Sequence, residues 1–237
     1  MKENFFGTTS SEFAKSRYVP VQDNSKLGKF NLSLGTNTSS IMQQDAKLVG
    51  FTSAKHKFVG KMFQDYDKVL EVGCMDGYGS MIVSQFVKSL TSIDFYAPHI
   101  AQAEQYVAPY FNNIKFKGYD FLDGPINQAF DGCFCLDVLE HIDPTQEDIF
   151  LKNVVASLGD SGAFIVGMPS LESQVYASAT NKFAHINCKT SEDFQTLLER
   201  HFKNVFSFGM NDEILHTGYP RMCQYLIKLC TGPIRNL

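Results

Sequence analysis

Carboxylate side chains stand at the ends of three predicted strands. Asp94, Asp120 and Asp137 each follow a short apolar segment. The carboxyl ends of parallel strands meet at one edge of a sheet, so we expect these side chains to lie close together. There Asp94 can accept hydrogen bonds from a ribose diol, and Asp120 stands beside the aromatic ring of Phe121. The chemistry indicated is nucleoside binding. The alternatives are a helix N-cap for Asp94 and a turn residue for Asp120.

A glycine-rich turn precedes these acids. Residues 69–79 (VLEVGCMDGYG) join a short apolar strand to a helical segment through Gly73, Gly77 and Gly79. Glycine takes positive φ without strain and lets a ligand approach the main chain closely. The spacing G-x-x-x-G-x-G differs from the dinucleotide fingerprint G-x-G-x-x-G. We therefore expect a nucleotide-binding corner of another type, the alternative being an ordinary glycine-rich strand–helix turn.

The elements that position these residues alternate along the chain. Short apolar segments predict strands, and apolar residues at helical spacing predict helices. The predicted strands are residues 68–72, 90–95, 114–118, 130–136, 163–168, 204–210 and 222–230, and the predicted helices are 53–63, 80–88, 98–111, 145–158 and 190–201. This alternation predicts an α/β fold with a seven-stranded, mostly parallel, doubly wound sheet. The last strand should pair antiparallel, because no crossover helix fits before it.

The first 50 residues are weakly patterned and are predicted to form an N-terminal extension to a domain at residues 51–237. Residues 31–44 are rich in Ser, Thr and Asn, which favour turns and caps over long elements. Two interpretations remain open, a mobile tail or a lid that orders when ligand binds. Aromatic residues such as Phe13 and Tyr18 would give a lid apolar anchors.

The composition of the chain limits the classes of partner and the cellular location that we expect. The net charge is −4, the pI is near 5.8, and no basic cluster is present, so we expect no binding to nucleic acid backbones. No apolar run has the length of a membrane span, and the first residues lack the apolar core of a signal peptide. The six cysteines form no C-x-x-C pair and are predicted to be reduced thiols of a cytoplasmic protein.

Two segments resemble known motifs. Glu71 with the glycine spacing that follows it resembles motif I of the class I S-adenosylmethionine-dependent methyltransferases. Residues 136–142 (LDVLEHI) resemble motif IV of the small-molecule branch of that family. The resemblance covers about residues 53–230. It implies S-adenosyl-L-methionine as cofactor and S-adenosyl-L-homocysteine as product.

The resemblance also implies positions around the cofactor. The residues that would border its methionine part are Glu71, Gly73, Cys74, Asp76, Gly77, Tyr78 and Gly79. By analogy, His56 from the basic group at residues 55–57 would meet the cofactor's carboxylate, the alternative being surface solvation. The residues that would surround the adenosine are Asp94, Phe95, Asp120, Phe121, Leu136 and Asp137, with Asp94 on the ribose and Asp120 on the adenine amino group.

Methyl transfer from a sulfonium is an in-line displacement, and a hydroxyl acceptor also needs a base. Histidine is the usual base at neutral pH. His141, His185 and His216 follow strand ends and should converge over one mouth; they are the base candidates in that order, with Asp137 beside them. An acceptor that is already ionised would instead need cationic donors, which His216 and Arg221 would supply. A structural or solvated role is the alternative for each histidine.

A metal site is a second interpretation of the same residues. Asp137, Glu140 and His141 stand at i, i+3 and i+4, and with His185 they form an oxygen- and nitrogen-rich set suited to Mg²⁺ or a transition ion. The pattern resembles the E-x-x-E-H site of certain quinone and RNA methyltransferases, with Asp at its first position here. Many relatives carry the E-H pair without a metal, so both alternatives stay open.

Two polar loops, residues 171–189 and 211–221, should meet the methyl acceptor, with the N-terminal extension closing from above. The predicted acceptor contacts are Tyr18, Tyr176, Asn181, His185, His216 and Arg221. The loops are polar without being basic, which favours a small polar acceptor. The whole-chain pattern resembles methyltransferases of bacterial surface-polysaccharide pathways, which implies a sugar, nucleotide-linked or phosphoramidate-type acceptor.

Three rival functions remain. A dehydrogenase would share the sheet and the ribose-binding acid, but its glycine spacing would differ. A non-catalytic cofactor-binding partner protein would bind the cofactor without turnover. An RNA methyltransferase is disfavoured by the acidic charge balance. The sequence leaves open the choice between oxygen and nitrogen as acceptor atom, and also the oligomeric state.

Overall fold

The computed structural model describes residues 12, 16–17 and 33–235. The chain divides into two compact units, residues 1–33 and 34–237, and the second contains the sheet. Tyr18, a predicted acceptor contact, lies outside the described residues. In the part of the chain that is described, no helix combines the length and the apolar character needed to cross a bilayer.

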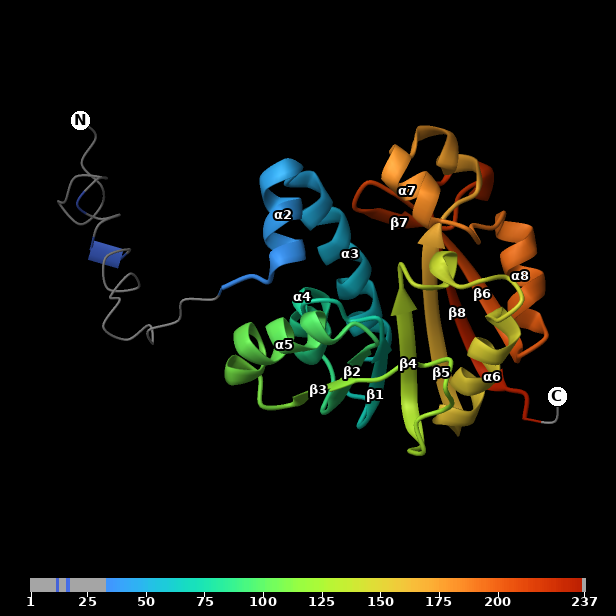
Figure 1. The fold of residues 1–237 in the computed structure, drawn as a ribbon, viewed down its shortest axis with the longest axis horizontal. Helices are drawn as coiled ribbons and strands as arrows, with labels where there is room; N and C mark the ends of the chain where they lie inside the picture. The colour runs from blue at the N-terminus through green and yellow to red at the C-terminus, as the bar shows by residue number, and fades with distance from the viewer. Residues whose placement is uncertain (1–11, 13–15, 18–32, 236–237) are drawn as a thin grey trace, which may run out of the picture. The chain divides into compact units, whose positions relative to one another are not determined.

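The second unit is built on one eight-stranded sheet in the order β3-β2-β1-β4-β5-β8-β6-β7 (Figure 1). The strands are β1 (Val69–Val72), β2 (Leu90–Asp94), β3 (Ile114–Gly118), β4 (Phe130–Leu136), β5 (Leu158–Pro169), β6 (Phe202–Asn211), β7 (Ile214–His216) and β8 (Tyr225–Pro233). Strands β1 to β5 pair parallel, whereas β8 pairs antiparallel with both β5 and β6. The predicted mostly parallel sheet with antiparallel C-terminal strands is confirmed.

The predicted number of seven strands is wrong by one. The additional strand, β7, forms a hairpin with the end of β6, and Asp212 at its turn has a φ of 46°. Sequence periodicity could not detect β7 because three residues are too few to show alternation. The hairpin lies within residues 211–221, which were predicted to be a polar loop.

Helices cover both faces of the sheet. They are α2 (Thr36–Gln44), α3 (Lys47–Met62), α4 (Tyr78–Ser84), α5 (Ala97–Tyr106), α6 (Glu147–Ser157), α7 (Ala179–Ala184) and α8 (Ser191–Glu199), with short 3₁₀ turns η2 (Ala108–Tyr110), η3 (Leu139–His141), η4 (Glu172–Tyr176) and η5 (Pro220–Met222). Figure 1 shows α3, α4 and α5 on one side of the sheet and α6 and α8 on the other. Each side has its own apolar core.

Strand β4 shows how one segment serves both cores. Cys133 and Cys135 belong to the core beneath α6 and α8, whereas Phe134 and Leu136 belong to the core beneath α3 and α4. Successive side chains of a strand point to opposite faces, so a continuous apolar run is what a strand covered on both faces requires. All six cysteines of the chain are free thiols, as predicted.

The second unit begins with a helix. Residues 36–44 form α2, although the Ser, Thr and Asn content of residues 31–44 predicted turns and caps. Its N-cap, Gly35, has no capping side chain. The cap instead comes from Asp76, whose carboxylate accepts hydrogen bonds from the backbone nitrogen of Thr38 at 2.8 Å and from its hydroxyl at 2.7 Å. The predicted boundary at residues 50/51 lies within α3.

Candidate functional site

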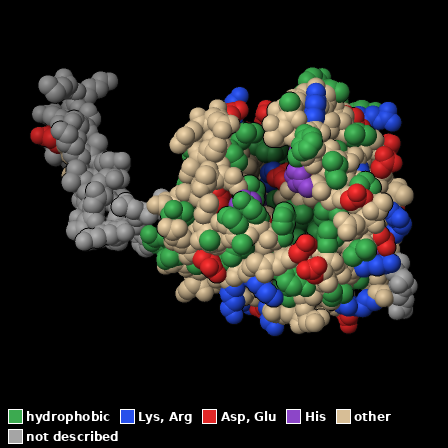
Figure 2. Space-filling view, in the orientation of Figure 1, with side chains coloured by type: hydrophobic (Ala, Val, Ile, Leu, Met, Phe, Trp, Pro, Cys, Tyr) green, Lys and Arg blue, Asp and Glu red, His purple; other side chains and the backbone are tan. Residues whose placement is uncertain are grey.

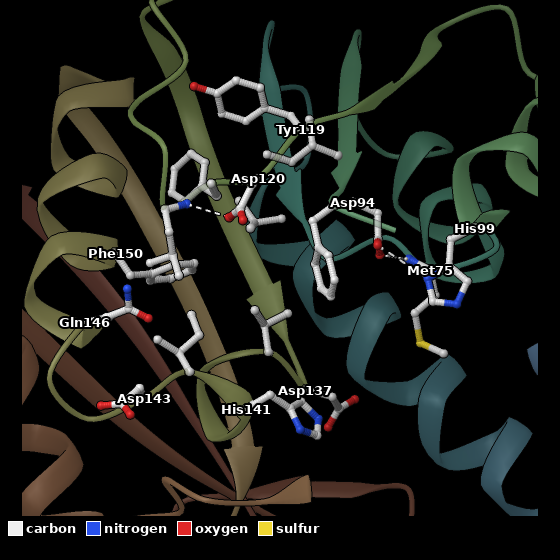
Figure 3. A pocket seen from close by; sticks show the side chains of 18 residues that line it. Met75, Asp94, His99, Tyr119, Asp120, Asp137, His141, Asp143, Gln146 and Phe150 are labelled. Atoms are coloured by element: carbon white, nitrogen blue, oxygen red, sulfur yellow. Dashed lines mark hydrogen bonds and ion pairs between the residues drawn. The ribbon is translucent and has the colours of Figure 1, made fainter. Parts of the chain in front are cut away.

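Two adjoining cavities open at the carboxyl ends of the parallel strands, and Figure 2 shows this face hollowed near its centre. The larger has a volume of about 590 Å³ and is bordered by the ends of β1 to β4 (Figure 3). The smaller, of about 130 Å³, lies between the glycine turn and helices α2 and α3. Gly73, Met75 and Asp137 line both cavities, so these residues mark the junction between them.

Two of the three glycines of the turn have positive φ. Gly73 and Gly77 each have a φ of 84°, a conformation that favours glycine. Gly79 is different, because it lies within α4 and a Cβ there would approach Nε2 of His56 to 2.0 Å. The third glycine therefore permits contact between α3 and α4. That role differs from the one expected of all three, the close approach of a ligand.

Glu71 is a buried acid at the smaller cavity. Its Oε2 accepts hydrogen bonds from the hydroxyls of Ser80 at 2.5 Å and Ser92 at 2.6 Å. Burial raises the pKa of Glu71 to about 7. This carboxyl faces the region that the resemblance assigns to the methionine part of the cofactor.

His56 also lines the smaller cavity. Burial lowers the pKa of His56 to about 4, so the ring is neutral. Its Nδ1 lies 2.8 Å from the carbonyl oxygen of Thr52, which can only accept, so we assign the proton to Nδ1. Its Nε2 lies 3.9 Å from Oε1 of Glu71. His56 therefore presents an uncharged imidazole, without the charge that would pair with a cofactor carboxylate.

Asp94 stands where β2 reaches the larger cavity, and it is 5% exposed. Its Oδ2 accepts from the backbone nitrogen of Met75 at 2.9 Å, and its Oδ1 accepts from that of Tyr96 at 2.9 Å. Nδ1 of His99 lies 3.4 Å from the same Oδ1 (Figure 3). Because each carboxylate oxygen has two acceptor sites, the side chain is fixed in place and can still accept from a diol.

The aromatic side of the larger cavity contains Phe95, Asp120 and Phe121, the residues whose role around an adenosine stays a prediction. Oδ1 of Asp120 accepts from the backbone nitrogen of Leu122 at 3.0 Å. Phe121 packs edge-on against Phe150, with ring centroids 5.3 Å apart. Phe95 is 77% exposed, so its ring is available to a bound ligand.

Further side chains of this cavity were not predicted. Tyr119, Ile142 and Gln146 also line it. Tyr119 and Ile142 adjoin the predicted residues Asp120 and His141 along the chain. Extending each strand-end motif by one or two residues would have included those two.

Asp137 occupies the junction of the cavities at the end of β4. Its φ of 59° lies in the left-handed region, which is unusual for a residue other than glycine. The ammonium of Lys55, which is 2% exposed on α3, forms an ion pair with its Oδ2. Sequence analysis placed Lys55 only within a basic group, and the two residues are 82 positions apart in the chain, so no local pattern signals the pair.

Glu140, His141 and His185 form a cluster beside this junction. Their possible ligand atoms lie within 4.8 Å of one another, and the two imidazole centroids are 5.1 Å apart. Glu140 is fully buried, and neither of its carboxyl oxygens has a hydrogen-bond partner among the described residues. Burial, with Asp137 next, raises the pKa of Glu140 well above its usual value. Asp137, the fourth predicted metal ligand, is paired with Lys55 instead.

Hydrogen bonds fix both imidazole rings of this cluster. Nδ1 of His141 lies 3.0 Å from the carbonyl oxygen of Ala184, and Nδ1 of His185 lies 3.0 Å from Oε1 of Gln174. If Nδ1 donates in each case, both rings present an unprotonated Nε2. Burial, with His141 next, lowers the pKa of His185, which favours that neutral form. Figure 3 shows His141 beside Asp137.

The other predicted acceptor residues lie away from the two cavities. Nε2 of His216 lies 2.9 Å from Oδ1 of Asn211, and its Nδ1 accepts from the backbone nitrogen of Gly218 at 3.0 Å. Arg221 pairs with Glu192 at 3.7 Å. Tyr176 and Asn181 are exposed on η4 and α7, and neither lines either cavity. Of the three base candidates, the structure thus brings only His141 and His185 together.

The remaining residues of the glycine turn differ in their contacts. Cys74, Asp76, Tyr78 and Gly79 line the smaller cavity with Leu136, whereas Gly77 does not. Both oxygens of Asp76 are engaged by Thr38, and the hydroxyls of Tyr78 and Ser53 lie 2.8 Å apart. The smaller cavity is also lined by Thr38, Ile41, Val49 and Thr52 of α2 and α3, which sequence analysis did not identify. Their contacts arise only when α2 and α3 fold over the turn.

Part of the chain is similar in sequence to known proteins. Residues 69–162 match a family model described as a methyltransferase domain. The carboxy-S-adenosyl-L-methionine synthase of Helicobacter pylori (strain P12) is 28% identical over 102 residues, which cover 42% of this chain. The match spans 41% of that relative's own length.

Solved methyltransferase structures share the fold. The N-methyltransferase NodS from Bradyrhizobium japonicum WM9, in complex with S-adenosylhomocysteine, superposes with a TM-score of 0.58 at 20% identity, over 77% of this chain and 86% of that one. The DhpI–SAH complex gives a TM-score of 0.58 at 16% identity, over 94% and 92%. These superpositions show that the sheet-containing unit has the Rossmann-like α/β fold of these methyltransferases, and residues 69–162 within it match the methyltransferase domain model.

Proposed function

We propose that the protein transfers a methyl group from S-adenosylmethionine to a small polar acceptor, by O-methylation of a sugar, nucleotide-linked or phosphoramidate-type group. The observation that carries the proposal is the pair of cavities that meet at Asp137, with His141 lining the larger one beside the junction and His185 against His141. A donor with a nucleoside at one end and an amino acid at the other fits two such cavities. Its sulfonium would then lie at the junction.

The donor is oriented by residues on both sides of the junction. In the larger cavity Asp94 accepts from the ribose hydroxyls, Asp120 accepts from the adenine amino group, and Phe95 and Phe121 border the base. In the smaller cavity the carboxylate of Glu71 attracts the donor's ammonium group. Holding both ends fixes the methyl group for an in-line approach by the acceptor.

His141 is the proposed base. Its Nε2 takes the proton from the acceptor hydroxyl while the oxygen attacks the methyl carbon, and the carbon–sulfur electron pair returns to sulfur. The bond from Nδ1 to Ala184 fixes the tautomer this step needs. His185, 5.1 Å away by ring centroid, orients the acceptor.

The same cluster fits a divalent cation. The buried carboxyl of Glu140 has no hydrogen-bond partner among the described residues, and three side chains offer ligand atoms within 4.8 Å. A bound cation would be held by Glu140, His141 and His185 and would lower the pKa of an acceptor hydroxyl. In that case Asp137 stays with Lys55 and is outside the ligand set.

The acceptor class rests on resemblance and on charge. The net charge of −4 disfavours nucleic acid, and the resemblance to surface-polysaccharide methyltransferases favours capsule-type groups. The cytoplasmic location predicted from the sequence belongs to the same proposal and is supported by six free thiols. The acceptor atom itself, oxygen or nitrogen, needs the experiment below.

The test is to measure product formation by the wild-type protein and by variants of the three candidate bases. Purified protein is incubated with labelled S-adenosylmethionine and a pool of sugar nucleotides and phosphorylated sugars, and products are read by mass spectrometry. We expect S-adenosylhomocysteine and a methylated acceptor, a fall of about 10²- to 10⁴-fold in kcat for H141A, and a smaller loss for H185A. H216A should have the least effect, because His216 lines neither cavity and, unlike His185, does not contact His141.

Other outcomes separate the rivals. Tighter binding of NAD than of S-adenosylhomocysteine would replace the proposal with a dehydrogenase. Cofactor binding without turnover in any pool, unaltered in H141A and H185A, would indicate a partner protein, and methylation of RNA alone would indicate an RNA methyltransferase. A carboxylated donor among the products would point to the reaction named for the Helicobacter pylori relative.

The metal question has a separate measurement. The metal content of the purified protein is determined by mass spectrometry, and activity is assayed after chelation and after Mg²⁺ or Mn²⁺ is restored. If the cluster holds a cation, E140Q should lose bound metal and metal-restored activity together, while donor binding changes little. Full activity in metal-free protein would exclude a catalytic cation.

A further inference from the structure

An ion pair between a buried lysine and a partly exposed aspartate stands at the point where the two cavities meet. Lys55 is 2% exposed, and its ammonium lies 4.5 Å from the ring centroid of Phe51 and 4.3 Å from that of Tyr225. Its carboxylate partner is Asp137. A lysine charge so far from water needs such a partner. The Asp137 side chain is 39% exposed, so the lysine is buried while its partner still reaches the cavities.

The surroundings of the pair hold its charges in place. Asp137 keeps an unusual φ of 59°, and its backbone nitrogen donates to the carbonyl oxygen of Gly167 at 3.0 Å. The Tyr225 hydroxyl is buried close to Asp137, and burial, with the charge of Asp137 next, raises the pKa of Tyr225 well above its usual value, so the ring stays neutral. Lys55 is thus the cation that offsets Asp137.

Methyl transfer changes the charge beside this pair. As the acceptor oxygen bonds to the methyl carbon, the carbon–sulfur bond breaks, its electron pair returns to sulfur, and the sulfonium becomes a neutral thioether. An unopposed carboxylate next to sulfur would stabilise the cationic donor more than the transition state, in which that charge is fading. Such ground-state stabilisation slows the chemical step.

We propose that Lys55 is a positioning residue that fixes Asp137 at the junction and cancels its charge, so that the site does not hold the sulfonium donor more tightly than the transition state. This inference rests on the proposed methyl transfer. It assigns to Lys55 a role in the relative affinity of the site for the donor and for its product, in addition to the packing of α3 on the sheet.

The balance can be measured by calorimetric titration without an acceptor. The quantity is the ratio of the Kd of S-adenosylhomocysteine to that of S-adenosylmethionine. K55M leaves a net negative charge beside the sulfur and should raise the ratio by about fivefold or more. The reason is that unit charges a few ångströms apart interact appreciably even at an effective dielectric constant near 20. D137N should lower the ratio, and K55M/D137N should return it close to the wild-type value.

Matched variants separate charge from packing. K57M makes the same substitution at an exposed position two residues along α3 and should leave the ratio unchanged. K55R keeps the charge and should retain a near wild-type ratio. Single-turnover assays with K55M should show a lower rate of methyl transfer. Steady-state assays should show an unchanged or lower KM for the donor. Thermal denaturation identifies variants that fail to fold, and D137N tests the same ratio in the opposite direction if K55M is among them.

Equal weakening of both ligands in K55M and D137N, with the ratio unchanged, would overturn the proposal and leave Lys55 a purely structural residue. A wild-type protein that binds neither ligand would instead refute the donor site itself. A raised ratio in K55M, lowered in D137N and restored in the double variant, would establish the charge balance.

Discussion

Glu71 is the clearest case of a residue whose surroundings change its chemistry. Two serine hydroxyls donate to one of its oxygens, yet burial dominates and raises the pKa of Glu71 from 4.5 to about 7. The group therefore changes charge within the physiological range. An empty site can keep it neutral, whereas the donor's ammonium favours the carboxylate.

The free energy of unfolding of the ligand-free protein should depend on pH because of the raised pKa of Glu71. Because the folded state binds the Glu71 proton more tightly than the unfolded state does, the contribution of Glu71 is fully present below pH 4.5 and is lost as pH rises through about 7. Relative to E71Q, the wild type should lose on the order of 3 kcal/mol of unfolding free energy across that window. Urea denaturation at pH 5 and pH 8 measures it, and parallel curves for the two proteins would contradict it.

Donor binding should have the opposite pH dependence at the same residue. The ammonium of S-adenosylhomocysteine favours the charged form of Glu71, so the rise in Tm that the ligand causes should be larger at pH 8 than at pH 6. In E71Q the rise should change little over the same interval. A pH-independent rise in the wild type would mean that the ligand's ammonium does not face Glu71.

At the scale of elements, the site depends on how closely α3 approaches α4. Helix α3 contributes Lys55 and His56, and α4 contributes Gly79, whose missing side chain leaves room for the His56 ring. The first turn of α4 therefore contributes to the site by allowing α3 to pack closely against it. The segment that resembles motif I contains information about packing as well as about ligand contact.

G79A tests this contact. The new Cβ would lie 2.0 Å from Nε2 of His56, so α3 must shift, and we expect a loss of about 1–3 kcal/mol in unfolding free energy together with weaker donor binding. G118A is the matched control, because a Cβ at Gly118 meets nothing within 4 Å. Adding H56A to G79A should recover part of the stability. Equal stability of G79A and G118A would contradict the packing role.

At the scale of the whole domain, α2 closes the smaller cavity by contacts with distant parts of the chain. The backbone nitrogen of Thr36 donates to Oε1 of Gln102 at 2.7 Å, Asn37 Nδ2 lies 2.8 Å from Nε2 of His99, and Thr38 binds Asp76. Helix α2 is too short to be stable by itself, so these tertiary contacts maintain it.

D76A should therefore release α2 while leaving the sheet intact. Hydrogen exchange of the amides of residues 36–44 should accelerate by at least about tenfold, since the variant loses two buried hydrogen bonds worth roughly 1–3 kcal/mol to a charged acceptor. Donor affinity should fall with it, because Thr38 and Ile41 line the smaller cavity. Q44A, at an exposed end of the same helix, is the control. Unchanged exchange in D76A would show that Asp76 does not hold α2.

The sequence by itself determined the parallel sheet, its antiparallel end and the carboxylates at the strand ends, because periodicity and strand-end position are local properties that the fold places along one edge. Even there, the three residues of β7 were too few to show a period. The pairing of Lys55 with Asp137, the capping of α2 by Asp76, and the separation of His216 from His141 and His185 were decided only by the tertiary structure. Each depends on packing between residues far apart in the chain, for which neighbouring residues carry no signal.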